Sequence, residues 1–450
     1  MPTPSNQEVV FSARFRCLAG CAERLPLDAP HYRCPTCNGL LEVEHDLAAL
    51  KVLDGAGWRK RFDERFAGQA RAGGSGVWAK HEWVMPNLRR EQIVTLGEGG
   101  TPLDPAKLLA AHLGVGQLYL KQCGQSPTGS FKDLGMTVLV SMVHQMRADG
   151  KPIRAVACAS TGDTSAALAA YCARAGLPSI VLLPRGKIST AQLLQPIAHG
   201  ARVFELDTDF DGCMALVDRL AREEGVYLAN SMNALRLEGQ KTVALELVQQ
   251  LGWHVPDFIV IPGGNLGNVS ALAAGLDMLF DLGLVVGRKP RIVVAQAERA
   301  NPLYRAFHND WKWEPQKAGE TLASAIQIGN PVSFERAKRA VLRYNGLVEQ
   351  ATEAELADVA AEADRAGHFV CPHTAVALAA VRTLAHRKTI TKNDDVVVIS
   401  TASGLKFTEF KVRYHEGQIP GVTSTLANPP LMLAPDYGAV VDAIRQRLAG

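Results

Sequence analysis

A lysine at position 132 stands where its charge is unfavourable for helix stability. Residues 126–135 read SPTGSFKDLG, and residues 130–133 have the form of a capping box, so a helix is predicted to begin there and to end at Gly150. Lys132 then lies in the first helical turn, whose partial positive charge lowers the pKa of an amine. A lysine of lowered pKa suits covalent attachment of an aldehyde, although a solvent-exposed lysine in a capped turn fits the same residues.

A glycine-rich loop, residues 261–268 (IPGGNLGN), follows one predicted strand and precedes a predicted helix. Glycines let successive backbone N–H groups approach and cradle a phosphate. The spacing departs from the G-x-G-x-x-G of dinucleotide loops, and the loop lacks the Gly-Lys-Ser/Thr ending of triphosphate loops. A small phosphorylated cofactor fits this loop better, and an ordinary tight turn is the alternative.

Three further segments bring anion-binding side chains to the ends of predicted strands. Residues 158–166 (CASTGDTSA) place hydroxyl groups at a helix N-terminus. Residues 230–242 (NSMNALRLEGQKT) add two asparagine amides, a lysine and Arg236, which can bind a phosphate bidentately. Residues 398–404 (VISTASG) place hydroxyl groups just past a strand, where α/β proteins bind ligands. Taken singly, each segment is also compatible with a polar turn or a capped helix start.

The elements that must position these side chains alternate along the chain. Short apolar runs are separated by helical stretches, a pattern that predicts βαβ units, parallel sheets and an α/β fold. A last amphipathic helix is predicted beyond residue 430. The predicted strands are residues 156–158, 179–183, 202–206, 226–228, 258–261, 291–295 and 396–399.

Composition excludes several classes of protein. The 450 residues are 47% hydrophobic and 21% charged, values typical of a globular protein. A net charge of +3 is too balanced to predict a nucleic-acid or membrane-surface partner. No apolar run reaches the ~18 residues of a membrane span, and no secretory signal is visible at the start. We therefore expect a cytoplasmic protein that acts on a small molecule.

Taken together and in this order, these segments resemble the fold-type II pyridoxal-phosphate enzymes, which are tryptophan synthase β-like. Among them the chain is most similar to the threonine synthases of the plant-type branch. The resemblance extends over roughly residues 75–440, and the strings PTGSFKD and NSxNxxRxEGQKT carry it most specifically. It implies a large cofactor-binding domain (96–131 and 251–430), a small α/β substrate domain (132–250), an N-terminal extension (1–95) and a C-terminal helix (431–450).

The resemblance also implies a reaction and a role for each site residue. A carbon–oxygen lyase would convert O-phospho-L-homoserine and water to L-threonine and phosphate, the last step of threonine biosynthesis, as a homodimer. Lys132 would hold pyridoxal phosphate and move protons, Phe131 would pack on its ring, and Thr401 would bond the ring nitrogen. The cofactor phosphate would be held by Gly263, Gly264, Asn265, Leu266, Gly267 and Asn268. The substrate would contact Ser160, Thr161, Thr164, Asn230, Ser231, Arg236 and, with less support, Lys241.

Two positions depart from the pattern of many relatives. Asp163 stands where many have asparagine beside the phenolic oxygen of the cofactor. An ionised aspartate would repel a phenolate, so a shared proton or a bridging group is needed. Ser403 stands where many have histidine, so no acid or base is assigned there.

Nine cysteines are present, and four of them cluster near the N-terminus. Cys17-x3-Cys21 and Cys34-x2-Cys37 are separated by twelve residues, which resembles a zinc ribbon with a closed structural site. A metal-free vestige and a disulfide remain open alternatives. The odd count and the scattered remainder suggest a reducing compartment.

Three rival functions share part of this pattern. Another fold-type II enzyme would perform β-replacement on O-phosphoserine or dehydrate serine or threonine. A catalytically silent protein would bind the cofactor or sense a metabolite. The N-terminal cysteines alone would also suit a zinc-ribbon nucleic-acid-binding or protein-binding module, which the balanced charge disfavours.

Overall fold

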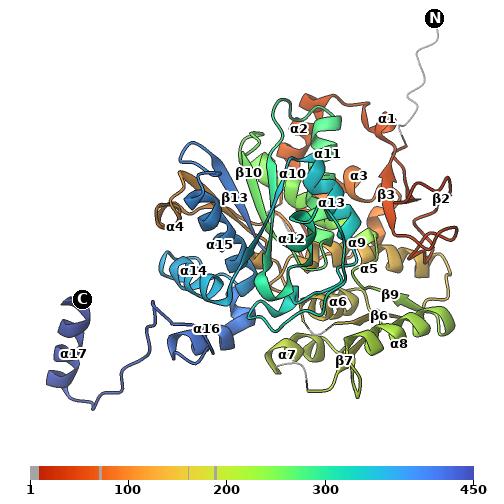
Figure 1. The fold of residues 1–450 in the computed structure, drawn as a ribbon. Helices are drawn as coiled ribbons and strands as arrows, with labels where there is room; N and C mark the ends of the chain where they lie inside the picture. The colour runs from red at the N-terminus through yellow and green to blue at the C-terminus, as the bar shows by residue number, and fades with distance from the viewer. Residues whose placement is uncertain (1–9, 70–72, 161, 187–189, 450) are drawn as a thin grey trace, which may run out of the picture.

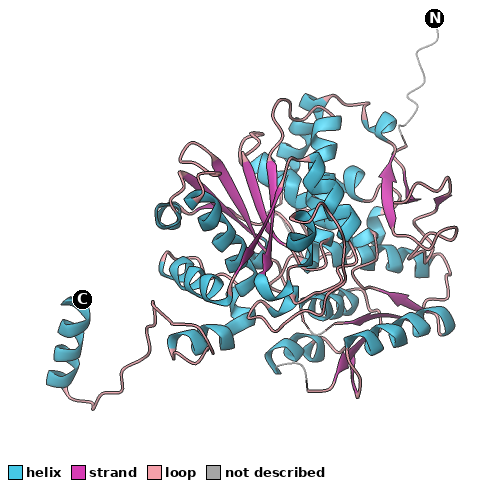
Figure 2. Ribbon diagram, in the orientation of Figure 1, coloured by secondary structure: helices cyan, strands magenta, loops and turns pink. Residues whose placement is uncertain are grey.

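Two sheets contain the strands predicted from the apolar runs. The computed structural model describes residues 10–69, 73–160, 162–186 and 190–449 (Figure 1, Figure 2). The larger sheet has the strand order β12-β11-β10-β13-β5-β4, in which β4 is antiparallel to β5 and the other pairs are parallel. Its strands are β4 Leu103–Pro105, β5 Gln117–Gln122, β10 Phe258–Pro262, β11 Arg291–Ala297, β12 Leu347–Ala351 and β13 Asp395–Ser400.

The smaller sheet has the order β8-β7-β6-β9 and is parallel throughout. Every residue of β6 and of β10 is buried, because helices or other chain segments cover both faces of these strands. This explains why they read as continuous apolar runs and not as alternating ones. The predicted α/β fold with parallel sheets is confirmed. The strands of the smaller sheet are β6 Ala155–Ala159, β7 Ser179–Pro184, β8 Arg202–Leu206 and β9 Val226–Leu228.

Alternate side chains of the larger sheet enter two different cores, as the two-residue period of a strand requires. Val260 and Val398 pack with residues of α4 (Lys107–Leu113), α14 (Glu353–Arg365) and α15 (Pro372–His386). Ile261 and Ile399 belong to the other core, with residues of α11 (Gly267–Asp281) and α13 (Phe334–Arg343). The sheet is therefore covered on both faces, and its strand ends are left for binding.

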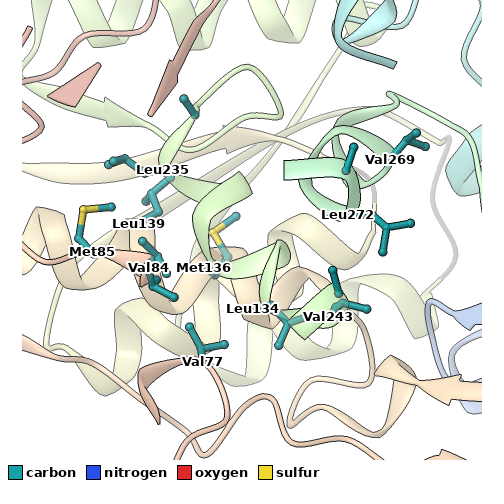
Figure 3. Close-up of a cluster of buried hydrophobic side chains, with 14 of the residues drawn as sticks. Val77, Val84, Met85, Leu134, Met136, Leu139, Leu235, Val243, Val269 and Leu272 are labelled. Atoms are coloured by element: carbon teal, nitrogen blue, oxygen red, sulfur yellow. The ribbon is translucent and has the colours of Figure 1, made fainter. Parts of the chain in front are cut away.

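Close packing of α5 (Lys132–Ala148) on α9 (Leu235–Gln240) fixes the chemistry-bearing ends of these helices. A Cβ atom at Gly239 would lie 1.6 Å from the carbonyl oxygen of Leu134, so only glycine allows this approach. A Cβ atom at Gly135 would likewise lie 2.8 Å from the carbonyl oxygen of Arg236. Figure 3 shows the surrounding cluster of buried side chains, which includes Leu134, Met136, Leu139, Leu235, Val243, Val269 and Leu272.

The ends of the chain add smaller elements. The N-terminal part forms an antiparallel sheet of order β2-β1-β3. At the other end, α17 follows an extended segment that leads away from the sheets (Figure 1). None of the helices in the described ranges has the length and hydrophobicity needed to cross a bilayer. These elements and the remaining helices are β1 Ala13–Cys17, β2 Arg24–Leu25, β3 Leu41–His45, α1 Leu47–Leu50, α2 Gly55–Ala67, α3 His81–Val84, α6 Asp163–Arg174, α7 Thr190–Ala198, α8 Phe210–Glu223, α10 Thr242–Gln250, α12 Pro302–Phe307, α16 Thr408–His415 and α17 Tyr437–Ala449.

Candidate active site

Strands of both sheets end at one pocket. Five predicted site segments each follow a strand: Lys132 after β5, Asp163 after β6, Ser231 after β9, residues 263–268 after β10 and Thr401 after β13. Ligands of parallel α/β sheets bind at this edge, the carboxyl end of the strands. The lining comprises the predicted Phe131, Lys132, Asp163, Ser231, Arg236, Gly264, Asn265, Leu266, Gly267, Asn268 and Thr401, together with Leu237, Gln240, Pro262, Ala325, Ile326, Ile328 and His373.

Lys132 begins α5 and opens onto this pocket. Its Nζ lies 4.2 Å from the centroid of the Phe131 ring. Desolvation lowers the pKa of Lys132 to about 7, and the positive charge of Arg236 adds to this effect, while Asp163 opposes it. An amine with this pKa is about half neutral near pH 7, and its neutral form can act as a nucleophile or a base.

The turn before Lys132 is held by backbone bonds to the segment after β13. Phe131 N donates to the carbonyl oxygen of Thr401 at 2.9 Å, and Ser403 N donates to that of Gly129 at 2.9 Å. The predicted capping box is wrong, because Phe131 is the N-cap residue and its side chain makes no capping hydrogen bond. Asp133 instead turns back to accept hydrogen bonds from the amide and hydroxyl of Thr128, at 2.7 and 2.5 Å. These bonds fix the position of Lys132 relative to Thr401.

The glycine loop presents donors to the opposite side of the pocket. A Cβ atom at Gly263 would lie 2.5 Å from Val294 Cγ1, and one at Gly264 would lie 3.0 Å from Ile326 Cγ2. Leu266 has a φ of 64°, and the fifteen-residue helix α11 begins at the next residue. Successive N–H groups in such a turn at a helix N-terminus attract an anion.

One side chain in this loop is left without a partner. Asn268 Nδ2 is buried and has no hydrogen-bond partner within the described part of the chain. A buried donor without a partner costs free energy unless a ligand accepts its hydrogen bond. The loop and Asn268 therefore fit the phosphate of the predicted cofactor.

Arg236 supplies a buried cation to the same pocket. One Nη donates to the carbonyl oxygen of Ala229 at 3.0 Å, and the other donates to Thr164 Oγ1 at 3.4 Å. Its Nε is buried and has no partner in the described ranges. Burial lowers the pKa of Arg236 to about 10, so the guanidinium stays charged at neutral pH. A second anion, apart from the one at the glycine loop, fits this donor set.

Asp163 has a cationic partner that the sequence analysis did not identify. Lys406 Nζ lies 3.3 Å from Asp163 Oδ1. The same Nζ donates to the carbonyl oxygen of Thr128 at 3.0 Å and to Gln195 Oε1 at 2.5 Å. Asp163 was predicted to need a shared proton or a bridging group. A search for cationic residues in the segment that follows Thr401 would have found Lys406.

Several predicted substrate residues do not line the pocket. Asn230 is bonded to the amide and carbonyl of Ala159, at 3.1 and 2.9 Å, so it joins the ends of β6 and β9. Lys241 is ion-paired with Glu238 and bonds His45 Nε2 at 2.9 Å. Ser160 Oγ accepts from the amide of Gly162 at 3.3 Å. The predicted Thr161 lies outside the described residues.

His373 is a lining residue that the sequence analysis did not select. Its Nε2 accepts a hydrogen bond from the amide of Ala325 at 3.0 Å, and its ring lies 4.8 Å from that of Phe407. It stands at the start of α15, inside the range 75–440 over which the resemblance extends, but the sequence analysis gave it no role.

Comparison with known proteins agrees with this geometry. The family model described as "Pyridoxal-phosphate dependent enzyme" matches residues 94–402. The chain is 52% identical over 429 residues to "Threonine synthase 2, chloroplastic" of Arabidopsis thaliana, a match that covers 95% of this chain and 83% of the relative. It is 39% identical over 406 residues to a threonine synthase of Methanocaldococcus jannaschii, covering 90% and 95% of the two chains. The solved structure of Escherichia coli threonine synthase has the same fold, with a TM-score of 0.65 at 22% identity, over 96% of this chain and 100% of that chain.

Proposed function

Because the chain belongs to the threonine synthase family of pyridoxal-phosphate-dependent enzymes, we propose that the pocket between Lys132 and Arg236 is its active site. The reaction predicted from the sequence, O-phospho-L-homoserine and water to L-threonine and phosphate, is confirmed by this membership, as are the lyase class and the cofactor. The single observation that supports the location is the joint presence of a desolvated lysine and two separate anion-binding groups in one pocket.

The residues present fit the cofactor at three points. Lys132 offers an amine of lowered pKa, the glycine loop with Asn268 offers phosphate donors, and Phe131 offers a ring face beside them. When bound, pyridoxal phosphate supplies the electron sink that makes the α- and β-protons of the substrate acidic. Thr401 is on the lining of the pocket. We propose that it would hold the ring nitrogen of the cofactor, and that its neutral hydroxyl would leave that nitrogen largely unprotonated.

Lys132 moves the protons. Its neutral amine takes the proton from the substrate α-carbon and then one from the β-carbon, while phosphate leaves from the γ-carbon. A proton then returns to the γ-carbon, water adds its hydroxyl group at the β-carbon while its proton goes to the released phosphate, and the α-carbon regains a proton to give threonine. An amine with a pKa of about 7 is suited to both halves of this sequence, because it gives and takes protons with little free-energy difference near neutral pH.

Arg236 holds the substrate phosphate. Its unpartnered Nε and its contact with Thr164 point to a phosphate bound between α9 and the start of α6, next to Ser231. The guanidinium stabilises the charge of the leaving phosphate, which increases as its ester bond breaks. Ser160, Thr161 and Thr164 remain the proposed ligands of the substrate carboxylate.

We propose that Asp163, which lines the pocket and is paired with Lys406, would be next to the phenolic oxygen of the cofactor. Lys406 keeps the carboxylate compensated, so Asp163 need not repel that oxygen. The pair also joins the small-sheet side of the pocket, at α6, to the segment after β13.

The domain division, the oligomeric state and the compartment are proposed from the resemblance and from the cysteines. Residues 96–131 and 251–430 would form the cofactor lobe and residues 132–250 the lobe that closes on substrate and excludes water. The resemblance supports a homodimer, and nine free cysteines support a reducing compartment such as the cytoplasm.

A coupled product assay tests the proposal. Purified protein loaded with pyridoxal phosphate receives O-phospho-L-homoserine, and inorganic phosphate and threonine are measured together, with O-phospho-L-serine as the parallel substrate. We expect equal amounts of phosphate and threonine from the first substrate and neither product from the second. Turnover of O-phospho-L-serine alone would show that the pocket performs β-replacement or dehydration, and it would overturn the proposal.

A further inference from the structure

The four N-terminal cysteines converge at one point of the fold. Their Sγ atoms all lie within 4.8 Å of one another, and the Sγ atoms of Cys17 and Cys37 are 3.4 Å apart. Cys17 and Cys34 are buried, Cys21 is half-buried and Cys37 is exposed. All nine cysteines of the chain are described and each is free, so this cluster presents four thiols and no disulfide. The other five cysteines are buried elsewhere in the fold.

This spacing is that of a metal-binding tetrahedron. Four sulfur atoms at about 2.3 Å from a zinc ion lie about 3.8 Å from one another. Two turns shape the cluster: Gly20 N donates to the carbonyl of Cys17 at 3.1 Å, and Asn38 N donates to that of Cys34 at 2.8 Å. Directly after the second turn, a Cβ atom at Gly39 would lie 3.1 Å from Cys37 Sγ. A glycine at this position therefore leaves room for the sulfur atoms.

We propose that Cys17, Cys21, Cys34 and Cys37 bind one zinc ion as a closed structural site. Four thiolates fill all four coordination positions of a tetrahedral zinc ion. Zinc has no redox chemistry, and such closed sites stabilise the fold of the segments that supply the ligands. None of the four cysteines lines the pocket, so any effect of the metal on the enzyme must pass through the segments that it holds in place.

Those segments contact both halves of the molecule. Between the two turns, Tyr32 accepts a hydrogen bond from the amide of Leu228 in β9 at 2.9 Å. Arg339 of α13 donates to the carbonyl oxygen of Leu18 at 3.0 Å. The zinc ion would therefore hold one loop against the smaller sheet and one turn against a helix of the larger-sheet half.

The same small sheet reaches the helix that bears Arg236. His45, at the end of β3, bonds Glu238 Oε2 at 2.6 Å, and Glu238 lies on α9 two residues after Arg236. Figure 1 shows β3 next to α9. A metal bound to Cys17, which ends β1 and pairs with Leu41 of β3, thus supports the position of α9 from outside the pocket.

Metal analysis of the intact holoenzyme tests the site. We expect one zinc and no iron per chain by plasma mass spectrometry after dialysis against a weak chelator. The variant Cys34→Ser/Cys37→Ser should lose this zinc, whereas the control Cys213→Ser, at a buried cysteine of α8, should keep it. Iron in place of zinc, less than about a tenth of an equivalent of zinc, or unchanged zinc in the double variant would each overturn the proposal.

A second measurement on the unmodified protein stands even if the variants fold poorly. Stripping the metal with a thiol-directed mercurial, followed by removal of the reagent with excess thiol, should speed tryptic cleavage after Arg24 and Arg33 at least about tenfold. Added Zn²⁺ should restore the slow rate, and Mg²⁺, which prefers oxygen ligands, should not. Equal cleavage rates before and after stripping would show that no metal holds this loop.

Discussion

Two lysines of this protein, Lys121 and Lys132, have opposite electrostatic surroundings. Lys121 in β5 is fully buried, and its Nζ donates to the carbonyl oxygen of Thr101 at 2.6 Å, to Glu246 Oε2 at 2.7 Å and to Gln250 Oε1 at 2.9 Å. Lys132, at the start of the next helix, opens onto the pocket and has an aromatic ring and the cation of Arg236 as neighbours. All three N–H groups of the Lys121 ammonium thus have acceptors, whereas the Lys132 amine has no comparable set of acceptors in the described part of the chain.

This difference separates a structural charge from a chemical one. A buried ammonium that keeps its proton needs a counterion and acceptors, because desolvation of an unpaired charge is expensive. Glu246 meets that need: burial would raise its pKa, but Lys121 and Lys80 outweigh this and lower it. Around Lys132 the neighbours instead favour the neutral amine, which is the reactive form.

Replacing the unsatisfied lysine should give the largest effect on catalysis. Lys132→Arg keeps the charge and much of the length but removes the amine that attacks an aldehyde and transfers protons. We expect kcat to fall at least about a thousandfold and the absorbance of the bound cofactor to be lost. Stopped assays for threonine and a visible spectrum after gel filtration measure both. A Lys132→Arg protein with parental turnover would refute the assignment of Lys132.

Replacing the satisfied lysine should affect folding and not chemistry. Lys121→Met leaves Glu246 buried without its partner, which should cost about 3–5 kcal/mol of unfolding free energy. The double variant Lys121→Met/Glu246→Leu removes both charges and should recover most of that loss. Guanidinium-induced unfolding measures the stabilities. If the double variant were no more stable than the single one, the pair would not be the reason for the loss.

The most apolar buried strands were predicted from the sequence, whereas β5 and β12, which carry charged residues, were missed. Residues 258–261 and 396–399 were predicted because every side chain favours burial. β5 contains Lys121 and β12 contains Glu349, which pairs with Arg387 at 2.8 Å, and these polar residues interrupt the apolar pattern. Their partners come from distant segments, so no local pattern reveals that the charges are compensated.

In the candidate site, too, local sequence patterns were predictable and long-range contacts were not. Lys132, Asp163, Arg236 and the glycine loop lie in locally distinctive strings, and the structure brings them to one pocket. Lys406 lies in a short 3-10 helix, and no feature of its local sequence marks it as a site residue. Its role becomes visible only from its ion pair with Asp163, which is distant in the sequence. The predicted capping box failed because Asp133 serves the turn before the helix and not the helix end.

Arg236 and Arg336 provide a matched pair of buried arginines, since burial lowers the pKa of each to about 10. Arg236→Lys should raise KM for O-phospho-L-homoserine about 10–100-fold, because a lysine lacks the bidentate donors and a charged hydrogen bond contributes about 1.5–3 kcal/mol. Arg336→Lys, whose guanidinium contacts the carbonyl of Leu41, should change KM less than about twofold. Steady-state kinetics decide the matter, and equal KM values for the two variants would argue against substrate binding by Arg236.

The pKa of Lys132 predicts a pH dependence with a definite sign. The neutral amine is the reactive form, so cofactor uptake by the cofactor-free protein should speed up about tenfold per pH unit below about pH 7 and level off above it. Arg236→Met removes a positive charge that lowers this pKa, so its plateau should begin at a higher pH. Stopped-flow absorbance measures the rates. An unchanged midpoint in the variant would mean that Arg236 does not act on Lys132 electrostatically.

The smallest effect should come from the pair at the edge of the pocket. Lys406→Met leaves the Asp163 carboxylate without the cation 3.3 Å away, so the carboxylate should repel the phenolic oxygen of the cofactor and lower kcat several-fold. The visible absorbance of the bound cofactor should shift as well.

Lys406 also bonds Thr128 and Gln195, so a structural loss alone would lower kcat too. Adding Asp163→Asn distinguishes the two explanations, because an amide has no charge that Lys406 must compensate. If electrostatics dominates, Lys406→Met/Asp163→Asn regains the spectrum and most of kcat; if Lys406 only braces the turn, the double variant remains as impaired as Lys406→Met.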